Sequence, residues 1–121
     1  MWGRNQKYGA RKTEYNGVRF DSRGEAGLAQ KIEIIARAGK IKSAERQVTF
    51  NLVGLRGNII CKHRVDFLIT LLDGSKEVWE FKGFEPPEWK IKRKLFRDNY
   101  PDIPYLIDGN KNSDIHLSKV R

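Results

Sequence analysis

Two acids and a lysine interrupt the most apolar part of this sequence. Asp66 lies in one predicted strand, and Glu80 and Lys82 lie in the next, within the stretch VDFLITLLDGSKEVWEFKG at residues 65–83. Carboxylate oxygens are preferred ligands of Mg²⁺, and a bound Mg²⁺ activates water and neutralises charge on a phosphate. A lysine beside such a pair can approach the attacking water or the phosphorus centre. The three residues indicate metal-assisted chemistry at a phosphate; the alternative is a solvated hairpin whose polar side chains face water.

The length of the turn between the two strands decides whether the acids meet. A two-residue loop of Asp73 and Gly74 places the acids on opposite faces of the hairpin. A three-residue loop that also includes Leu72, with Gly74 in the left-handed conformation, places Asp66 opposite Glu80. Opposed residues have Cβ atoms about 5 Å apart, where two carboxylates repel unless a cation lies between them. We expect the second register, or a bulge with the same effect.

A third acid, Glu25, belongs to a predicted helix over residues 22–38. It shares a face with Leu28 and Ile32, so we expect it on the side that packs against the sheet. Ser22 and Glu25 also have the spacing of a capping box, in which Glu25 bonds the backbone of Ser22. The sequence leaves both roles open, as a helix cap or as an acid of the metal site.

The elements that position these residues follow from periodicity and turn signals. A second helix is predicted from Pro87 to Pro101. Strands are predicted over residues 47–55, 59–72, 76–82 and 104–108. The order α-β-β-β-α-β predicts an α/β fold, a mixed β-sheet flanked by helices, whose last strand pairs parallel to residues 76–82 through a right-handed crossover. We expect a basic, mobile arm over residues 1–19 and a single domain over residues 20–121.

The charge balance favours a polyanionic partner. The 121 residues include 24 Lys and Arg against 15 Asp and Glu, a formal net charge of +9. Such an excess is typical of nucleic-acid-binding proteins, although some inhibitors are equally basic. The longest apolar run, FLITLL, is far shorter than the roughly 20 residues of a membrane span. Together with the lone Cys61 and the absence of an apolar segment after the basic N-terminus, this predicts a cytoplasmic protein without a membrane partner.

Two basic segments are candidates for contacts with nucleic acid. One face of the second helix is predicted to form a continuous basic ridge, with Ile91, Leu95 and Phe96 toward the other side. The ridge consists of Lys90, Arg93, Lys94 and Arg97. In the arm, basic residues lie among aromatic ones, a mixture that suits phosphate contacts with base stacking. These arm residues are Arg4, Lys7, Arg11 and Lys12. The alternatives are a solvated helix face and a disordered tail.

Three further residues lie near the predicted site. Two roles stay open for Lys92 and for Gln47, and a structural role is expected for His63. Lys92 falls within the apolar arc of the second helix, where it either snorkels or reaches a phosphate near Lys82. Gln47 either points into the same cleft or bonds backbone at a sheet edge. His63 is expected on the face opposite Asp66, in a structural role. One Cys and two His provide no zinc site.

Several segments, taken in order, resemble a known family. FDSRGEA, ERQVTF, VDF, VWEFKGF and KIKRKLF resemble a small phage-borne family labelled only as a domain of unknown function, over about residues 15–100. The acids and the lysine resemble the PD-(D/E)xK nuclease superfamily, which has the restriction-endonuclease-like fold and includes Holliday-junction resolvases. Val65 stands where the superfamily motif has proline.

The resemblance implies a role for each site residue. Asp66 and Glu80 are implied metal ligands together with the Phe81 carbonyl, Lys82 is the implied catalytic lysine, and Glu25 is the helix-borne acid. The expected protein is therefore a DNA endonuclease that uses Mg²⁺, for which Mn²⁺ can substitute.

The expected substrate is branched DNA such as a Holliday junction, because a chain this short has no room for an added sequence-reading domain. Cutting opposed strands of a junction favours a symmetric homodimer. If the protein is phage-encoded, the expected location is the host cytoplasm. The alternatives are a general DNA nickase or exonuclease of the same superfamily and a non-catalytic nucleic-acid-binding module. The choice between DNA and RNA stays open.

Overall fold

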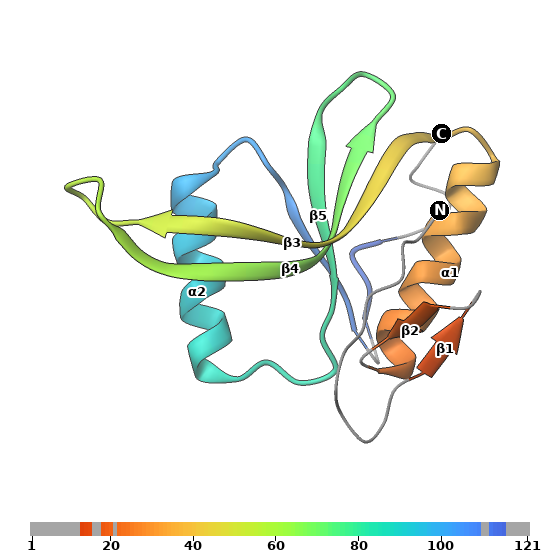
Figure 1. Ribbon diagram of the computed structural model, residues 1–121, viewed down its shortest axis with the longest axis horizontal. Helices are drawn as coiled ribbons and strands as arrows, with labels where there is room; N and C mark the ends of the chain where they lie inside the picture. The colour runs from red at the N-terminus through yellow and green to blue at the C-terminus, as the bar shows by residue number, and fades with distance from the viewer. Residues whose placement is uncertain (1–12, 16–17, 21, 110–111, 116–121) are drawn as a thin grey trace.

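Four strands form a mixed sheet, and one long helix lies against each of its faces. The computed structural model describes residues 13–15, 18–20, 22–109 and 112–115. Its main elements are α1 (Arg23–Arg37), β3 (Ile41–Val53), β4 (Ile59–Leu71), β5 (Lys76–Phe81), α2 (Pro87–Asn99) and β6 (Tyr105–Asp108) (Figure 1). The predicted α/β fold with the order α-β-β-β-α-β is confirmed. Two short strands, β1 (Thr13–Tyr15) and β2 (Val18–Phe20), pair antiparallel before α1, at the end of the predicted arm.

The sheet has the strand order β3-β4-β5-β6. Its first three strands are antiparallel, and β6 pairs parallel to β5 as predicted. The predicted start of the first of these strands at Gln47 was wrong, because β3 begins at Ile41. The charged stretch before Gln47 pairs with the end of β4 and leaves most of its polar side chains exposed, so hydrophobicity alone does not reveal it.

Each helix covers its own hydrophobic cluster. On the α1 side, Leu28 and Ile32 pack with Phe67 and Trp79. On the α2 side, a second cluster lies between that helix and the sheet. Its buried members are Leu52, Val65, Leu68, Val78, Trp89, Phe96, Tyr105 and Ile107. The two clusters lie on opposite faces of the sheet. Side chains that belong to different faces therefore come together only where the alternation along a strand is irregular.

Such an irregularity lies in the middle of β3 and β4. Val65 packs in the α2-side cluster and Phe67 in the α1-side cluster, although regular alternation would give them one face. On β3 the same change separates Ala44 from Val48, and Gln47 between them has a positive φ of 55°. The outer half of the hairpin therefore packs on α2 and projects past it (Figure 1), whereas in the inner half Phe67 and Ile69 pack on the α1 side and Leu68 on the α2 side.

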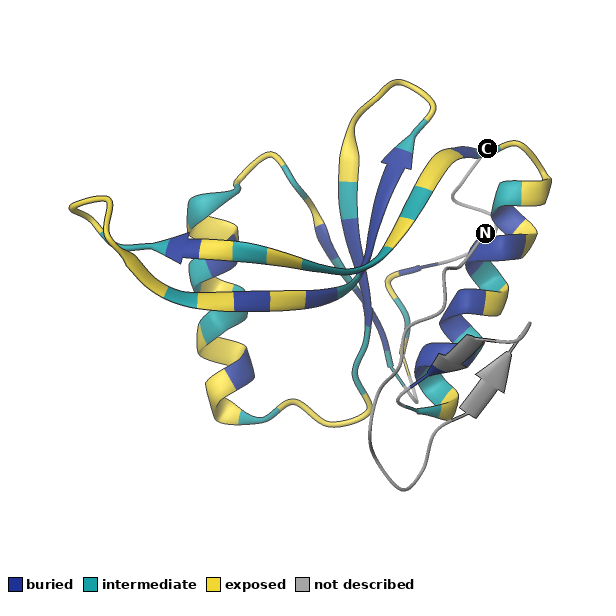
Figure 2. Ribbon diagram, viewed as in Figure 1, coloured by how far each residue is buried: buried dark blue, intermediate teal, exposed yellow. Residues whose placement is uncertain are grey.

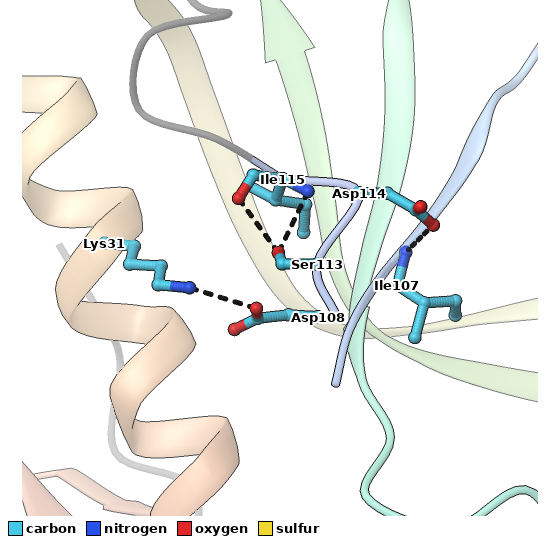
Figure 3. A network of polar contacts seen from close by, with 6 residues as sticks. All are labelled: Lys31, Ile107, Asp108, Ser113, Asp114 and Ile115. Carbon is cyan, nitrogen blue, oxygen red and sulfur yellow. Dashed lines mark hydrogen bonds and ion pairs between the residues drawn. The ribbon is translucent and has the colours of Figure 1, made fainter. Parts of the chain in front are cut away.

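The chain after β6 folds back onto the end of that strand. Asp108 forms an isolated bridge with Ser113, and its side chain accepts a hydrogen bond from Lys31 of α1 at 3.0 Å (Figure 3). Asp114 accepts the backbone N–H of Ile107 at 3.0 Å. These contacts fix the end of β6, next to β5, against α1. No helix among the described residues is long and apolar enough to cross a membrane.

Candidate active site

The turn between β4 and β5 has the length that brings the acids together. The N–H of Leu71 donates to the carbonyl of Ser75 at 2.8 Å, and the N–H of Gly74 donates to the carbonyl of Leu71 at 3.0 Å. Gly74 is left-handed, with φ 90°. The expected three-residue loop is therefore confirmed. The ladder runs from Thr70 opposite Lys76 to Phe67 opposite Trp79, and Asp66 and Glu80 are the next residues along the two strands.

Asp66 lies where β4 and β5 stop pairing through their backbones. The ladder ends at Phe67 and Trp79, and beyond it Oδ2 of Asp66 accepts the N–H of Phe81 at 2.9 Å. Its neighbour Lys82 donates its N–H to β6 instead. Because the N–H and C=O of one strand residue point to the same side, the carbonyl of Phe81 also faces the side of Asp66. Two carboxylates and one carbonyl thus converge at this point of the sheet.

Glu80 is held by two donors that the sequence did not identify. Its carboxylate is 2% exposed. Oε1 accepts the hydroxyl of Tyr105 at 2.9 Å, and Oε2 accepts the indole N–H of Trp89 at 2.6 Å. Alternation along β6 does place Tyr105 on one face with Ile107, but the pairing with Glu80 depends on a register that the sequence does not give.

His63 completes this buried network. The sequence had predicted that His63 lies on the face of the sheet opposite Asp66. Its Nε2 lies 2.8 Å from the hydroxyl of Tyr105. That prediction applied to regular alternation along β4, and the change of face between Val65 and Phe67 breaks this alternation. Burial, together with the charges of Lys92 and Lys82, lowers the pKa of His63 to about 4. A neutral ring that donates from Nε2 leaves the Tyr105 proton for Glu80.

Both acids resist ionisation in this position. The pKa of Asp66 is raised well above its ordinary value, first by burial and then by the charges of Glu80 and Glu25. Burial also raises the pKa of Glu80, against the hydrogen bond from Tyr105 and the charge of Lys82. A cation between the two carboxylates would favour their charged forms and offset this cost.

The donor set suits a hard divalent cation such as Mg²⁺. Two carboxylates and a backbone carbonyl are the oxygen ligands that Mg²⁺ takes, with water and substrate phosphate completing its shell. The carboxylate of Glu80 accepts from Tyr105, from Trp89 and from the backbone N–H of Asp66, which leaves about one of its four lone pairs for a cation. Within the described ranges, no three His, Cys, Asp or Glu residues gather as a metal-binding group. The site therefore offers two acids rather than a complete protein cage.

Glu25 and Arg46 lie beside this site on the α1 side. Glu25 is buried, and its Oε2 lies 3.7 Å from a guanidinium nitrogen of Arg46. The guanidinium of Arg46 also stacks 4.3 Å from the ring centre of Phe20. The backbone N–H of Glu25 donates to the side chain of Ser22 at 3.1 Å, which confirms Ser22 as the helix cap. The charge of Glu25 contributes to the raised pKa of Asp66, after burial and the charge of Glu80.

Arg93 and Ile91 of α2 do not lie on the faces of the helix that the sequence predicted. Arg93 does not join an outer ridge, because it donates to the carbonyl of Tyr105 at 3.1 Å and lies against the rings of Tyr105 and Trp89. Ile91, expected toward the apolar side, is 67% exposed. The remaining exposed basic residues, here called the outer α2 cations, are Lys90, Lys94 and Arg97.

Lys82, Lys92 and Gln47 lie around the network. The ammonium of Lys82 is 5.3 Å from the ring centre of Trp89. Lys92 lies 3.5 Å from Glu88, and its influence on His63 places it on the same side of the sheet as Lys82. Gln47 is half-buried and lies opposite Asp66 in the β3–β4 register. The arm residues Arg4, Lys7, Arg11 and Lys12 lie outside the described residues.

Comparison with known proteins gives one match. The family model with the description "Protein of unknown function (DUF1064)" matches residues 5–113. No curated protein and no solved structure matches the chain. The matched range includes every residue of the buried network, so the site lies inside the part that defines the family.

Proposed function

We propose that this chain, which belongs to the family described as "Protein of unknown function (DUF1064)", is a Mg²⁺-dependent endonuclease that hydrolyses phosphodiester bonds in DNA. The observation that carries the proposal is the β4–β5 register, whose last pair is followed by Asp66 on one strand and Glu80 on the other, close enough for the charge of Glu80 to raise the pKa of Asp66. Two acids with raised pKa values at adjacent positions cost stability, and a cation-dependent function accounts for that cost. The same reasoning supports membership of the PD-(D/E)xK superfamily with its restriction-endonuclease-like fold.

Each residue of the site has a distinct role in this reaction. Asp66, Glu80 and the Phe81 carbonyl hold Mg²⁺, which when bound lowers the pKa of water and neutralises charge on the phosphate. Lys82 supplies a positive charge that orients the attacking water or stabilises charge on the phosphate oxygens. Trp89 and Tyr105 fix the rotamer of Glu80 through its two oxygens. In the reaction the oxygen of water bonds to phosphorus and one ester P–O bond breaks.

We extend the proposal to branched DNA and to a symmetric homodimer. The described chain is occupied by one core fold, which leaves shape rather than base sequence as the feature to be recognised. Two sites on opposed strands of a junction require two copies related by a twofold axis. The reaction would take place in the cytoplasm, where the half-buried Cys61 stays reduced.

Cleavage assays test this proposal. The purified protein is incubated with a labelled four-way junction and with linear duplex, in Mg²⁺ or in EDTA. Asp66→Asn is compared with Asp102→Asn, an exposed acid away from the site. The proposal predicts Mg²⁺-dependent products with wild type and Asp102→Asn and none with Asp66→Asn. Products that survive Asp66→Asn would exclude it.

A non-catalytic nucleic-acid-binding module is the second candidate. It is favoured by the burial of Glu80, whose two oxygens already have protein donors. In this second function the carboxylate of Glu80 fixes Trp89 and Tyr105 in the α2-side core and binds no metal. A gel shift that Asp66→Asn leaves unchanged, with no turnover of any DNA or RNA, would favour this function.

A further inference from the structure

The outer half of the β3–β4 hairpin projects from the rest of the fold. This segment, here called the outer ribbon, comprises residues 48–65 and extends past α2 to the loop at the far left of Figure 1. One face packs on α2 through Leu52 and Val65. None of the described helices covers the other face, and Figure 2 shows exposed positions alternating with buried ones along β4 and continuing through the loop.

The uncovered face is polar and basic. Arg64 lies opposite Thr49, and Lys62 lies opposite Asn51, and all four are exposed. Residues 46–65 contain no Asp or Glu. Among the described residues, no ion pair involves Lys62 or Arg64. Both cations are therefore available to an anionic partner.

The end of the outer ribbon is apolar. Leu55 is fully exposed, and Ile59 and Ile60 are 56% and 57% exposed. Single exposed apolar residues are common on protein surfaces. Here three of them gather at one projecting turn beside Arg56, which is also exposed. A projecting apolar tip behind a basic face is the arrangement with which proteins enter a nucleic-acid groove and press between base steps.

We infer that the outer ribbon is a nucleic-acid-binding arm, in which Lys62 and Arg64 contact phosphates and the tip around Leu55 contacts bases. The inference deepens the proposed function and rests on it for the identity of the substrate as DNA. The ribbon begins next to Asp66, so a duplex at the acids would continue along it. The strand from Asp66 to Ile60 extends over about 20 Å. This is more than the roughly 12 Å width of a major groove, which admits a two-stranded ribbon.

Charge distinguishes this partner from a second copy of the chain. Each copy carries a net charge of +9, and two basic faces without acids would repel each other. A polyanion instead releases counterions when these cations bind it, which favours association. The apolar tip gives the ribbon a second contact that depends little on salt.

Binding measurements on an inactive background test the inference. Every protein carries Asp66→Asn, so that affinity is measured without cleavage, by fluorescence anisotropy with labelled duplex between 50 and 200 mM salt. The double variant Lys62→Gln/Arg64→Gln is compared with the double variant Arg37→Gln/Lys42→Gln. The second pair is exposed, carries the same charge and lies away from the ribbon. The loss of two phosphate contacts lowers the slope of log affinity against log salt concentration by about 1.8. Between 50 and 200 mM salt, the ribbon variant therefore loses about 12-fold less affinity than its parent. Equal slopes for the two variants would overturn the inference.

A second pair of variants tests the tip. Leu55→Ser is compared with Leu72→Ser, which lies exposed in the β4–β5 turn. Both are expected to unfold at the parental temperature, because neither side chain is buried. We expect Leu55→Ser alone to weaken duplex binding several-fold with an unchanged salt slope. Binding that neither ribbon variant alters, with self-association that Leu55→Ser abolishes, would assign the tip to a protein contact and overturn the inference.

The outcomes separate this inference from the proposed function. Ribbon-dependent DNA binding by a protein that cuts nothing would sustain the arm and refute the nuclease. Mg²⁺-dependent cleavage, together with DNA binding that does not change when Lys62 and Arg64 are substituted, would support the proposed nuclease and refute the nucleic-acid-binding arm. A protein that binds no nucleic acid would refute both.

Discussion

Asp66→Asn is expected to stabilise the cation-free protein. In wild type, Asp66 lies opposite Glu80, and the two carboxylates raise the cost of each other's ionisation. At about 5 Å and an effective dielectric constant near 20, the repulsion is about 3 kcal/mol. The charge of Lys82 offsets part of it. The amide oxygen of asparagine can still accept the N–H of Phe81, so the change removes charge without removing this hydrogen bond.

The expected gain in the free energy of unfolding is therefore about 1–3 kcal/mol at pH 8 in EDTA. For a chain of this length it corresponds to roughly 4 °C in melting temperature per kcal/mol. Differential scanning calorimetry measures it, and Asp102→Asn serves as the exposed control. Mg²⁺ at ten times its dissociation constant stabilises wild type by about 1.4 kcal/mol and leaves Asp66→Asn unchanged.

The pH dependence of this difference follows from the direction of the pKa shift. The folded-state pKa of Asp66 lies above its ordinary value of 3.8, so folding favours the protonated form. The associated stability is complete below the unfolded pKa and is lost as pH rises through the folded pKa. Asparagine does not titrate, so the advantage of Asp66→Asn should disappear in acid and be complete above the raised pKa. A variant that is no more stable than wild type at pH 8 would refute the repulsion.

Three further changes test other parts of the account. Tyr105→Phe removes a buried donor from Glu80 and should lower the free energy of unfolding by about 1–3 kcal/mol, measured by urea denaturation; an unchanged midpoint would mean that the hydrogen bond is not formed. Gly24→Ala places a Cβ into the ring of Phe81 and should destabilise by about 1–3 kcal/mol, whereas Gly27→Ala meets no atom within 4 Å and should stabilise by up to about 1 kcal/mol. Equal melting temperatures for the two alanine variants would contradict the close packing of α1 on β5. Replacing the outer α2 cations with glutamine should lower the log–log salt slope of DNA binding by about 0.9 per lost phosphate contact, and a retained slope would exclude this face from the interface.

Local geometry explains why the turn between β4 and β5 could be predicted. The three-residue turn depends on Gly74 adopting a left-handed conformation, which glycine does without steric cost. Once the turn length is known, alternation along β4 and β5 places Asp66 opposite Glu80. The helices were predictable for a similar reason, because their apolar residues recur at helical spacing within one segment.

Tertiary contacts explain what the sequence did not reveal. Gln47 has a positive φ, a conformation that its residue type disfavours, so nothing local marked the change of face or the placing of His63 with the site. A helical wheel could not separate Arg93 from the outer α2 cations. Its guanidinium lies inward because Tyr105, in a strand distant along the chain, offers both a carbonyl and a ring.

Direct measurement of cation binding tests the central claim. Mn²⁺ binding is followed by electron paramagnetic resonance of the free ion, with wild type, Asp66→Asn, Glu80→Gln and the control Asp102→Asn. We expect wild type and the control to bind one Mn²⁺ per chain, which excess Mg²⁺ displaces, and both site variants to bind Mn²⁺ much more weakly. Wild type that binds no Mn²⁺, or site variants that bind it as tightly as wild type, would contradict a metal site at Asp66 and Glu80.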